Sequence, residues 1–353
     1  MPFQMTFVQN RIFLYTKNHL PLLDNYYTCG SFYHQNYYNT VKFVTIVLVK
    51  YMKRYLSSDN FFKKTFGKKT IRLSLSSGLS CPNRDGKLSY EGCIFCGKAG
   101  SGEFAADKNL SIKKQIEEQI KFLSPKWKTD SYIAYFQNFT NTYADPSYLK
   151  KIFDQAIAYD GVKGLAIATR CDCLSPEIIE LLKEYDKKTF LFLELGLQSV
   201  NENTINFINR GYSQKFFDEK VNILKNEGIR FLTHIIFGLP YENREDFLNT
   251  VNYVSKIHPF GVKFHSFYIQ KDTKIYKEFL KKPFPLLTKD EYTDIICDAL
   301  EILPKDIVIH RLTGDPKKDL LLAPKWTLDK AKVLSGIDHE LKMRDLPLIK
   351  EEK

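Results

Sequence analysis

Short apolar segments alternate with amphipathic ones along most of the chain. The apolar segments predict strands over 71–77, 132–137, 165–169, 190–198, 229–237 and 262–269. The segments between them carry apolar residues three or four positions apart and predict helices over 111–123, 146–159, 175–185, 214–227 and 244–257. Ser175 followed by Pro176 is typical of a helix start, and Gly228 is typical of a helix end.

This alternation amounts to six strand–helix units, which predict an α/β fold with a parallel sheet covered by helices. The strands are mostly apolar, as strands buried on both faces are. The pattern does not decide between a doubly wound sheet and a partial barrel. In both architectures the functional loops lie at the carboxyl ends of the strands.

The strand predicted over 190–198 separates two faces by simple alternation. Its four leucines share one face, which we expect to pack on helices. The other face would line the inside of the fold and carries Phe190, Phe192, Glu194, Gly196 and Gln198. A carboxylate among apolar neighbours needs a partner. Glu194 is therefore expected to contact either a bound ligand or a lysine or arginine inside the barrel.

A cysteine-rich loop directly follows the first predicted strand. Three of the seven cysteines, Cys81, Cys93 and Cys96, lie within sixteen residues among several glycines. Three thiolates can hold three irons of a [4Fe–4S] cluster and leave the fourth iron open to a small molecule. A zinc site completed by a distant histidine, such as His34 or His234, is the alternative. The odd cysteine count favours a reducing compartment over disulfides.

The stretch 81–102 contains Cys-Pro-Asn-Arg-Asp-Gly, Gly-Cys-Ile-Phe-Cys and Gly-Ser-Gly. It resembles the radical S-adenosylmethionine (SAM) superfamily, in particular the Elp3-like branch and its YhcC/YtqA-type bacterial group, and the resemblance extends from about 52 to 345. It implies a partial (β/α)6 radical SAM barrel with a C-terminal helical extension. It also implies a [4Fe–4S] cluster and SAM as cofactors, which together release a 5′-deoxyadenosyl radical that takes a hydrogen atom from a C–H bond.

The resemblance assigns roles to individual residues. The expected cluster ligands are Cys81, Cys93 and Cys96. The expected cofactor-binding residues are Phe95, Gln137, Asn138, Thr140, Arg170, Glu194, Gln198, Ile236 and Gly238. The expected substrate-binding residues are Lys263, His265, Arg311 and Asp315.

Some of these assignments have a purely structural alternative. Many superfamily members carry Gly-Gly-Glu where this chain has Gln137 to Thr140, so which of these residues contacts SAM stays open. The same residues could simply form a turn that caps the next helix, and His265 could be an ordinary core residue. Cys171 and Cys173, two positions apart without further ligands, are not expected to bind a metal.

The charge of the chain suits an anionic partner. The formal net charge is +11, which favours nucleic acid, although a solvated basic surface explains it equally well. The resemblance implies tRNA as the partner, conversion of a carboxymethylaminomethyl group on the wobble uridine to an aminomethyl group, and a flavodoxin or ferredoxin as electron donor. The alternatives are a radical SAM enzyme acting on a small molecule and a non-catalytic, zinc-stabilised nucleic-acid-binding module. No apolar stretch reaches 18 residues, so we expect a cytoplasmic protein without a membrane span.

Composition divides the chain into three expected parts. Residues 1–51 hold a single acidic residue, Asp24, and twelve aromatic residues. They are expected to be either an upstream region outside the native protein, which would then start at Met52, or a poorly ordered extension. Residues 52–303 would form the barrel, and 304–353 an extension that faces the substrate or tRNA or closes the barrel. Within that extension, 328–344 predicts a helix with lysines on its polar face.

Overall fold

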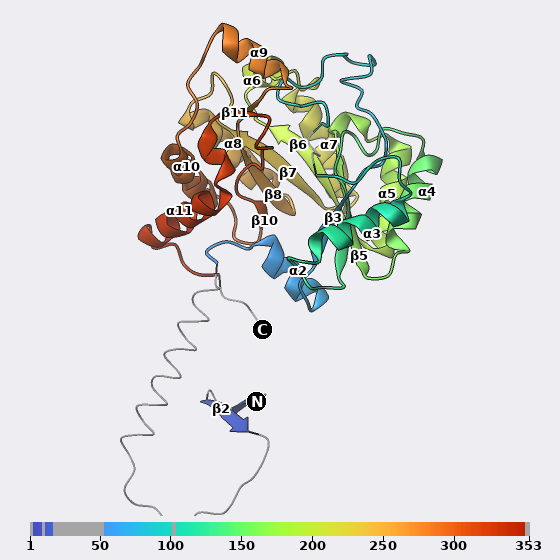
Figure 1. The fold of residues 1–353 in the computed structure, drawn as a ribbon, viewed down its shortest axis with the longest axis vertical. Coiled ribbons are helices and arrows are strands. Elements are labelled where there is room, and N and C mark those ends of the chain that lie inside the picture. The colour runs from blue at the N-terminus through green and yellow to red at the C-terminus, as the bar shows by residue number, and fades with distance from the viewer. Residues whose placement is uncertain (1–2, 9–10, 17–52, 101–103, 350–353) are drawn as a thin grey trace, which may run out of the picture. The chain divides into compact units, whose positions relative to one another are not determined.

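The computed structural model describes residues 3–8, 11–16, 53–100 and 104–349 (Figure 1). The chain divides into two compact units, residues 1–52 and 53–353. In the first unit, strands β1 (Phe3–Val8) and β2 (Arg11–Thr16) pair antiparallel. The expected start at Met52 lies outside the described residues. The second unit contains the predicted barrel and the candidate site residues, except His34 of the zinc alternative, which also lies outside the described residues.

Seven parallel strands form one curled sheet in the order β10–β8–β7–β6–β5–β4–β3 (Figure 1). The strands are β3 (Ile71–Leu75), β4 (Tyr132–Phe136), β5 (Val162–Thr169), β6 (Phe190–Gln198), β7 (Phe231–Phe237), β8 (Gly261–Ser266) and β10 (Val308–Arg311). The predicted partial barrel is therefore confirmed, with one strand more than expected. A separate antiparallel pair consists of β9 (Ile269–Gln270) and β11 (Leu321–Ala323).

Helices cover the outer face of the sheet. Those that follow the strands are α3 (Ile112–Leu123), α4 (Pro146–Ile157), α5 (Pro176–Lys188), α7 (Gln214–Asn226), α8 (Arg244–Ile257) and α10 (Lys289–Ile302). Most begin at a side chain that accepts a backbone N–H, such as Ser175 for α5 and Thr288 for α10. The four leucines of β6 belong to the large core beneath these helices, as the alternation predicted.

The remaining helices lie outside this regular pattern. They are α2 (Ser58–Phe66), α6 (Glu202–Phe207), α9 (Lys274–Lys281) and α11 (Lys330–Met343). Helix α11 confirms the predicted C-terminal helix, except that its predicted first residue, Leu328, belongs to the 3₁₀ turn η2 (Lys325–Leu328). No helix in the described ranges is both long enough and apolar enough to cross a lipid bilayer.

An aromatic cluster fills the amino-terminal end of the barrel. Phe62 of α2 is 2% exposed and packs with Phe192 of β6 and Ile133 of β4 on the inner face of the sheet. Phe61 and Phe190 pack against the same cluster. Because side chains close this end, only the carboxyl end of the barrel is left to hold a ligand.

Both edges of the open sheet are covered. At the β3 edge, the Gln115 side chain of α3 accepts the backbone N–H of Ser76 at 2.8 Å and donates to its carbonyl at 3.1 Å. At the β10 edge, the backbone N–H of Ile309 donates to the Leu56 carbonyl at 2.7 Å. Unpaired backbone groups on an edge strand invite pairing with another chain. Here a side-chain amide and a short chain segment satisfy several of those groups.

Candidate functional site

A cavity opens at the carboxyl ends of the strands. The cysteine loop after β3 forms one part of its lining. Residues in or just after β4 to β8 form another, and the rest comes from β9, β10 and the loop after β10. This is the location that the strand–helix pattern predicted for a functional site. Polar side chains contribute most of the lining, and Phe95, Phe139, Ile236 and Phe267 add apolar surface.

The cysteine loop presents three half-buried thiols to this cavity. Cys81, Cys93 and Cys96 all line it, and none forms a disulfide. The Asn83 side chain donates to the sulfur of Cys93 at 3.7 Å. A hydrogen bond from Cys96, with Arg170 and Asn83 nearby, lowers the pKa of Cys93 to about 7. The same hydrogen bond raises the pKa of Cys96. The loop therefore favours the thiolate at Cys93 and the thiol at Cys96, and the thiolate is the form that binds iron.

The arrangement of the thiols fits a cluster better than a single ion. Among the described residues there is no group of three or more His, Cys, Asp or Glu side chains close enough to hold one metal ion. A structural zinc site requires four ligands around one point. The irons of a [4Fe–4S] cluster lie at different corners, so their thiolates need not converge. Three thiols that line one cavity, of which Cys93 and Cys96 are hydrogen-bonded, are consistent with this.

Two of the three candidates after β4 reach the cavity. Gln137 and Thr140 line it, whereas Asn138 lines a separate hollow beside Ser76. Phe139, at φ 55°, turns the backbone between them. Thr140 is fully buried, and its hydroxyl has no hydrogen-bond partner in the described part of the chain. A buried polar atom without a partner costs free energy, so Thr140 fits a site that a ligand completes.

Two arginines, Arg170 and Arg210, line the same cavity as the cysteine loop. The Arg170 side chain lines the cavity and forms two hydrogen bonds to Asp172, at 2.9 and 2.7 Å. Arg210 is 1% exposed and donates through Nη1 to the carbonyls of Leu197 and Ser199. Its Nη2 has no partner within the described ranges, and the residue lines the cavity. Sequence reasoning missed Arg210, because an arginine in a short loop after α6 carries no pattern of its own.

Glu194 is held by several cations inside the barrel. Its carboxylate accepts hydrogen bonds from Lys263 at 2.5 Å, Tyr135 at 2.5 Å and Arg72 at 3.2 Å, and His234 Nε2 lies at 3.0 Å. Burial alone would raise the pKa of Glu194, but Lys263, His234 and Arg72 hold it well below its usual range. Of the two expected partners of Glu194, a lysine or arginine inside the barrel is the one present, although the Glu194 side chain also borders the cavity.

Three of the four remaining cofactor candidates line the cavity, and one does not. Gln198 and Ile236 line the cavity, and so does Phe95, which also packs on a small core that includes Ile208 and Phe267. Gly238 does not line it. It adopts φ 90°, and a Cβ there would lie 3.1 Å from the Leu287 side chain. The glycine thus serves a left-handed turn and close packing after β7 rather than contact with the cavity.

The substrate candidates lie at two depths. His265, Arg311 and Asp315 line the cavity, whereas Lys263 is 4% exposed and lies deeper, against Glu194 and Tyr135. The expectation that Lys263 faces the cavity is wrong. Alternation along β8 gave its face correctly but could not give its depth in the barrel. Cys171 and Cys173 form the turn η1 beside Asp172 and do not line the cavity.

Several further cavity residues were not among the predicted ones, and they include His234, Tyr268 and Gln270. His234 stacks on His265 with ring centroids 5.1 Å apart. Tyr268 and Gln270 line the cavity from the segment after β8. His234 follows the same inward alternation as Ile236 along β7, so parity could have found it. Gln270 gives no such signal, because its position depends on the pairing of β9 with β11.

Comparison with known proteins agrees with the fold and the loop. Residues 81–254 match the radical SAM superfamily, and residues 259–343 match the Radical_SAM C-terminal domain. Protein YtqA of Bacillus subtilis is 39% identical over 292 residues, which cover 83% of this chain and 91% of YtqA. The chain belongs to the radical SAM superfamily, and its cofactors are a [4Fe–4S] cluster and SAM.

Two further relatives and one solved structure are also similar to this chain. Protein YhcC of Escherichia coli K12 is 30% identical over 279 residues, covering 79% of this chain and 89% of YhcC. A solved structure of Methanocaldococcus infernus Elp3 with its N-terminus deleted shares the fold, with a TM-score of 0.60 and 16% identity. That match covers 79% of this chain, and the chain spans 64% of that structure. The tRNA methylthiotransferase MtaB of Bacillus subtilis is 29% identical over 132 residues, 36% of this chain and 29% of MtaB.

Proposed function

We propose that this radical SAM enzyme modifies the wobble uridine of tRNA, converting a carboxymethylaminomethyl group to an aminomethyl group. Cys81, Cys93 and Cys96 would hold three irons of the cluster. The observation that carries the proposal is the cavity itself, in which three half-buried thiols face buried donors without partners, such as Thr140 and Arg210. When bound, the cluster and SAM supply a radical that would remove a hydrogen atom from the methylene of –NH–CH₂–COO⁻. Return of one electron to the cluster would leave an imine, and water would hydrolyse it, breaking the N–C bond to give the aminomethyl group and glyoxylate.

The other residues of the cavity would position the reactants. Gln137, Thr140 and Gln198 border it from the ends of β4 and β6 and would hold the polar groups of SAM. Phe95 and Ile236 would exclude water from the reacting atoms. Asn138 and Gly238, which lie outside the cavity, are not part of this proposal.

Two features support tRNA as the substrate. Phe104 lines the cavity and is 51% exposed, so it offers a ring on which an extruded base could stack. Exposed lysines, Lys98 and Lys271, are close in sequence to the cavity residues Gly100 and Gln270 and could meet phosphates. The similarity to MtaB, which is named for its action on tRNA, points in the same direction. A flavodoxin or ferredoxin in the cytoplasm would supply the electron.

The decisive experiment uses anaerobically reconstituted enzyme, SAM, a reductant and tRNA that carries carboxymethylaminomethyluridine. Mass spectrometry of the digested tRNA is expected to show aminomethyluridine. Cys81→Ala, Cys93→Ala and Cys96→Ala should each remove both the iron–sulfur absorbance and the product. Cys297→Ala is the matched control, because this thiol is fully buried against α11, outside the cavity, and its loss should leave the cluster in place.

Other outcomes would select other functions. Methionine and 5′-deoxyadenosine formed without any change in the tRNA would favour a small-molecule substrate. A colourless protein that retains zinc and ignores SAM would contradict the proposal and favour a nucleic-acid-binding module.

A further inference from the structure

The part of the cavity farthest along the chain from the cysteine loop holds one arginine and two histidines. Arg311 ends β10, and His265 and His234 come from β8 and β7. Burial lowers the pKa of both histidines, so the positive charge here belongs to Arg311. Glu194 is bound from below by Lys263 and Arg72 and lies 3.0 Å from His234 Nε2, so its negative charge is balanced by these partners.

Arg311 forms one long ion pair among the described residues, with a carboxylate that it shares. Its nearest acid is Asp315, with 3.8 Å between Nη2 and Oδ2, and the same Asp315 oxygen lies 2.8 Å from Lys330. The Arg311 side chain is 29% exposed, so most of it is removed from water. A guanidinium in such a position normally pairs with a carboxylate or phosphate, often through two parallel hydrogen bonds.

Two buried donors line the same cavity as Arg311. Gln270 is 3% exposed, and its Nε2 has no hydrogen-bond partner in the described part of the chain. Nε2 of His265 is likewise buried and unpaired there. Buried polar groups are normally satisfied. The Gln270 amide donates, and His265 Nε2 donates in the tautomer that carries its proton there. These groups line the same cavity as Arg311, whose one ion pair is long, and together they are what a site for an anionic ligand provides.

The loop after β10 fixes this arrangement. The backbone N–H of Gly314 donates to the Ser266 side chain at 3.3 Å. A Cβ at position 314 would lie 2.7 Å from the Tyr268 ring. The glycine therefore allows the segment that carries Arg311 and Asp315 to lie directly on the end of β8, where His265 is located.

We propose that Arg311, with His265 and Gln270, binds a carboxylate of the substrate. This inference rests on the proposed function, in which the modified uridine ends in –NH–CH₂–COO⁻. A site that holds this carboxylate would distinguish the substrate from the product, which lacks it, and would keep the adjacent C–H bonds at a fixed place in the cavity. Arg311 is then a determinant of specificity.

The first test does not depend on RNA. N-methylglycine carries the same –NH–CH₂–COO⁻ group, and dimethylamine is its counterpart without the carboxylate. The enzyme is reconstituted, mixed with SAM and treated with phenylglyoxal, and peptide mass spectrometry measures the rate at which Arg311 reacts. N-methylglycine should slow this reaction at least about twofold, and dimethylamine should not. Arg244, which lies in α8 with its side chain 46% exposed, is the internal reference and should react at the same rate in all samples. Equal effects of the two amines on Arg311 would overturn the proposal.

The second test uses anticodon stem-loops with either carboxymethylaminomethyluridine or aminomethyluridine. The wild type should bind the first about tenfold more tightly, as one charge-assisted hydrogen-bond pair allows. Arg311→Gln should reduce this preference to less than about twofold, and Arg311→Lys should keep part of it. Lys318→Gln, at an exposed lysine, removes the same charge and should weaken both complexes alike.

The two proposals fail in different ways. Protection of Arg311 by N-methylglycine without binding of either stem-loop would remove tRNA as the substrate and keep the carboxylate site. Binding of both stem-loops with equal affinity, with no protection of Arg311, would keep tRNA and refute the site.

Discussion

At the scale of single residues, Glu194 is the central charge of the barrel interior. Its side chain is fully buried, and its hydrogen-bond partners come from β3, β4, β7 and β8. A buried ion pair gains little net stability over apolar packing, but removal of one partner leaves an unbalanced charge in a medium of low polarity. Glu194 thus fixes Lys263 and Arg72 beneath the cavity.

Glu194→Gln should therefore destabilise the protein strongly. We expect the free energy of unfolding to fall by about 3–5 kcal/mol, because Lys263 and Arg72 lose the carboxylate that they share. Urea denaturation would measure the change. Glu180→Gln is the matched control, because Glu180 pairs with Lys183 on the surface with 70% of its side chain exposed. Its effect should stay within about 0.5 kcal/mol, and a similar value for Glu194→Gln would refute the central role of this carboxylate.

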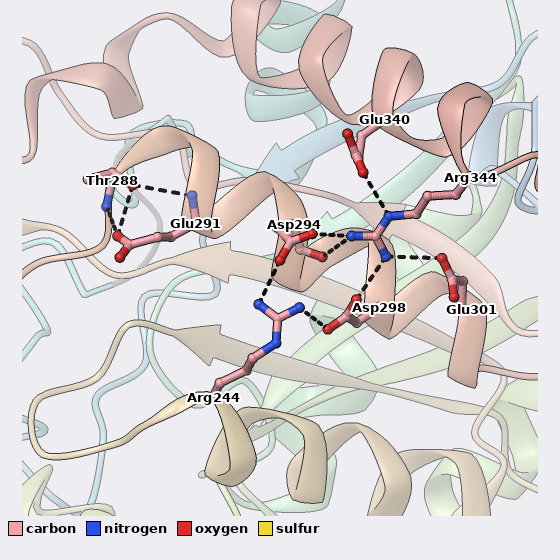
Figure 2. Close-up of polar contacts among 8 residues, drawn as sticks. All are labelled: Arg244, Thr288, Glu291, Asp294, Asp298, Glu301, Glu340 and Arg344. Carbon is pink, nitrogen blue, oxygen red and sulfur yellow. Dashed lines mark hydrogen bonds and ion pairs between the residues drawn. The ribbon is translucent and has the colours of Figure 1, made fainter.

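At the scale of elements, ion pairs fasten the C-terminal helix to the body of the fold. Figure 2 shows Arg344, at the end of α11, reaching toward acids of α10. Its guanidinium bonds Asp298 at 2.8 Å, Glu301 at 3.0 Å and Glu340 of its own helix at 2.9 Å. Arg244 of α8 forms ion pairs with two acids of α10, Asp298 and, at 2.8 Å, Asp294 (Figure 2). The three helices thus share one network.

Arg344→Ala should loosen α11 more than it unfolds the whole protein. Networks of several charges stabilise more than isolated surface pairs, and the Arg344 side chain is only 20% exposed. We expect amide hydrogen exchange in α11 to accelerate and the free energy of unfolding to fall by about 1–3 kcal/mol. Lys332→Ala, which removes a lysine that is 77% exposed from the same helix, should change neither. Equal exchange rates in the two variants would show that α11 is held by its apolar face alone.

At the scale of the whole molecule, one carboxyl group links the stability of the fold to pH. Glu242 follows β7 and accepts a hydrogen bond from Ser199, which follows β6. Burial raises the pKa of Glu242 to about 7, although Ser199 opposes the shift. In the unfolded chain this carboxyl loses its proton near its ordinary pKa of 4.5.

This shift makes the folded protein less stable as the pH rises from about 4.5 to about 7. In that window the unfolded chain releases the proton of Glu242 while the folded protein retains it, so the unfolded state gains stability. Above pH 7 both states are ionised and the effect levels off. Urea denaturation of the wild type and of Glu242→Gln between pH 5 and 8 should give curves that diverge at low pH, with the decline smaller in the variant. Parallel curves would contradict the raised pKa.

Much of this molecule could be predicted from local patterns. Period-two alternation placed Glu194 and Gln198 on the inner face of β6. The spacing of apolar residues placed the covering helices except α10, which was not predicted. The cysteine spacing identified the loop. Strand β10 was missed because four residues carry too little periodicity, and α2 was missed because its phenylalanines lie in a lysine-rich segment.

The rest of the site depends on contacts between distant segments. Arg210 and Gln270 reach the cavity only through the folding of loops whose partners lie far away in the chain. Lys263 had the correct face but the wrong depth, because alternation carries no information along the barrel axis. Gly238 was predicted to contact the cofactor, whereas in the structure it makes a left-handed turn packed closely against the Leu287 side chain.

The hydrogen bond between Leu56 and Ile309, which covers the edge of strand β10, affects how the protein folds during synthesis. The Leu56 carbonyl that receives the Ile309 N–H leaves the ribosome long before its partner does. Contacts between residues so far apart in sequence form late and slow folding. A partly synthesised chain that lacks β10 has an open β8 edge, so the nascent protein passes through a stage in which chaperones, or a neighbouring nascent chain, can reach that strand. Only the finished chain can close its own sheet.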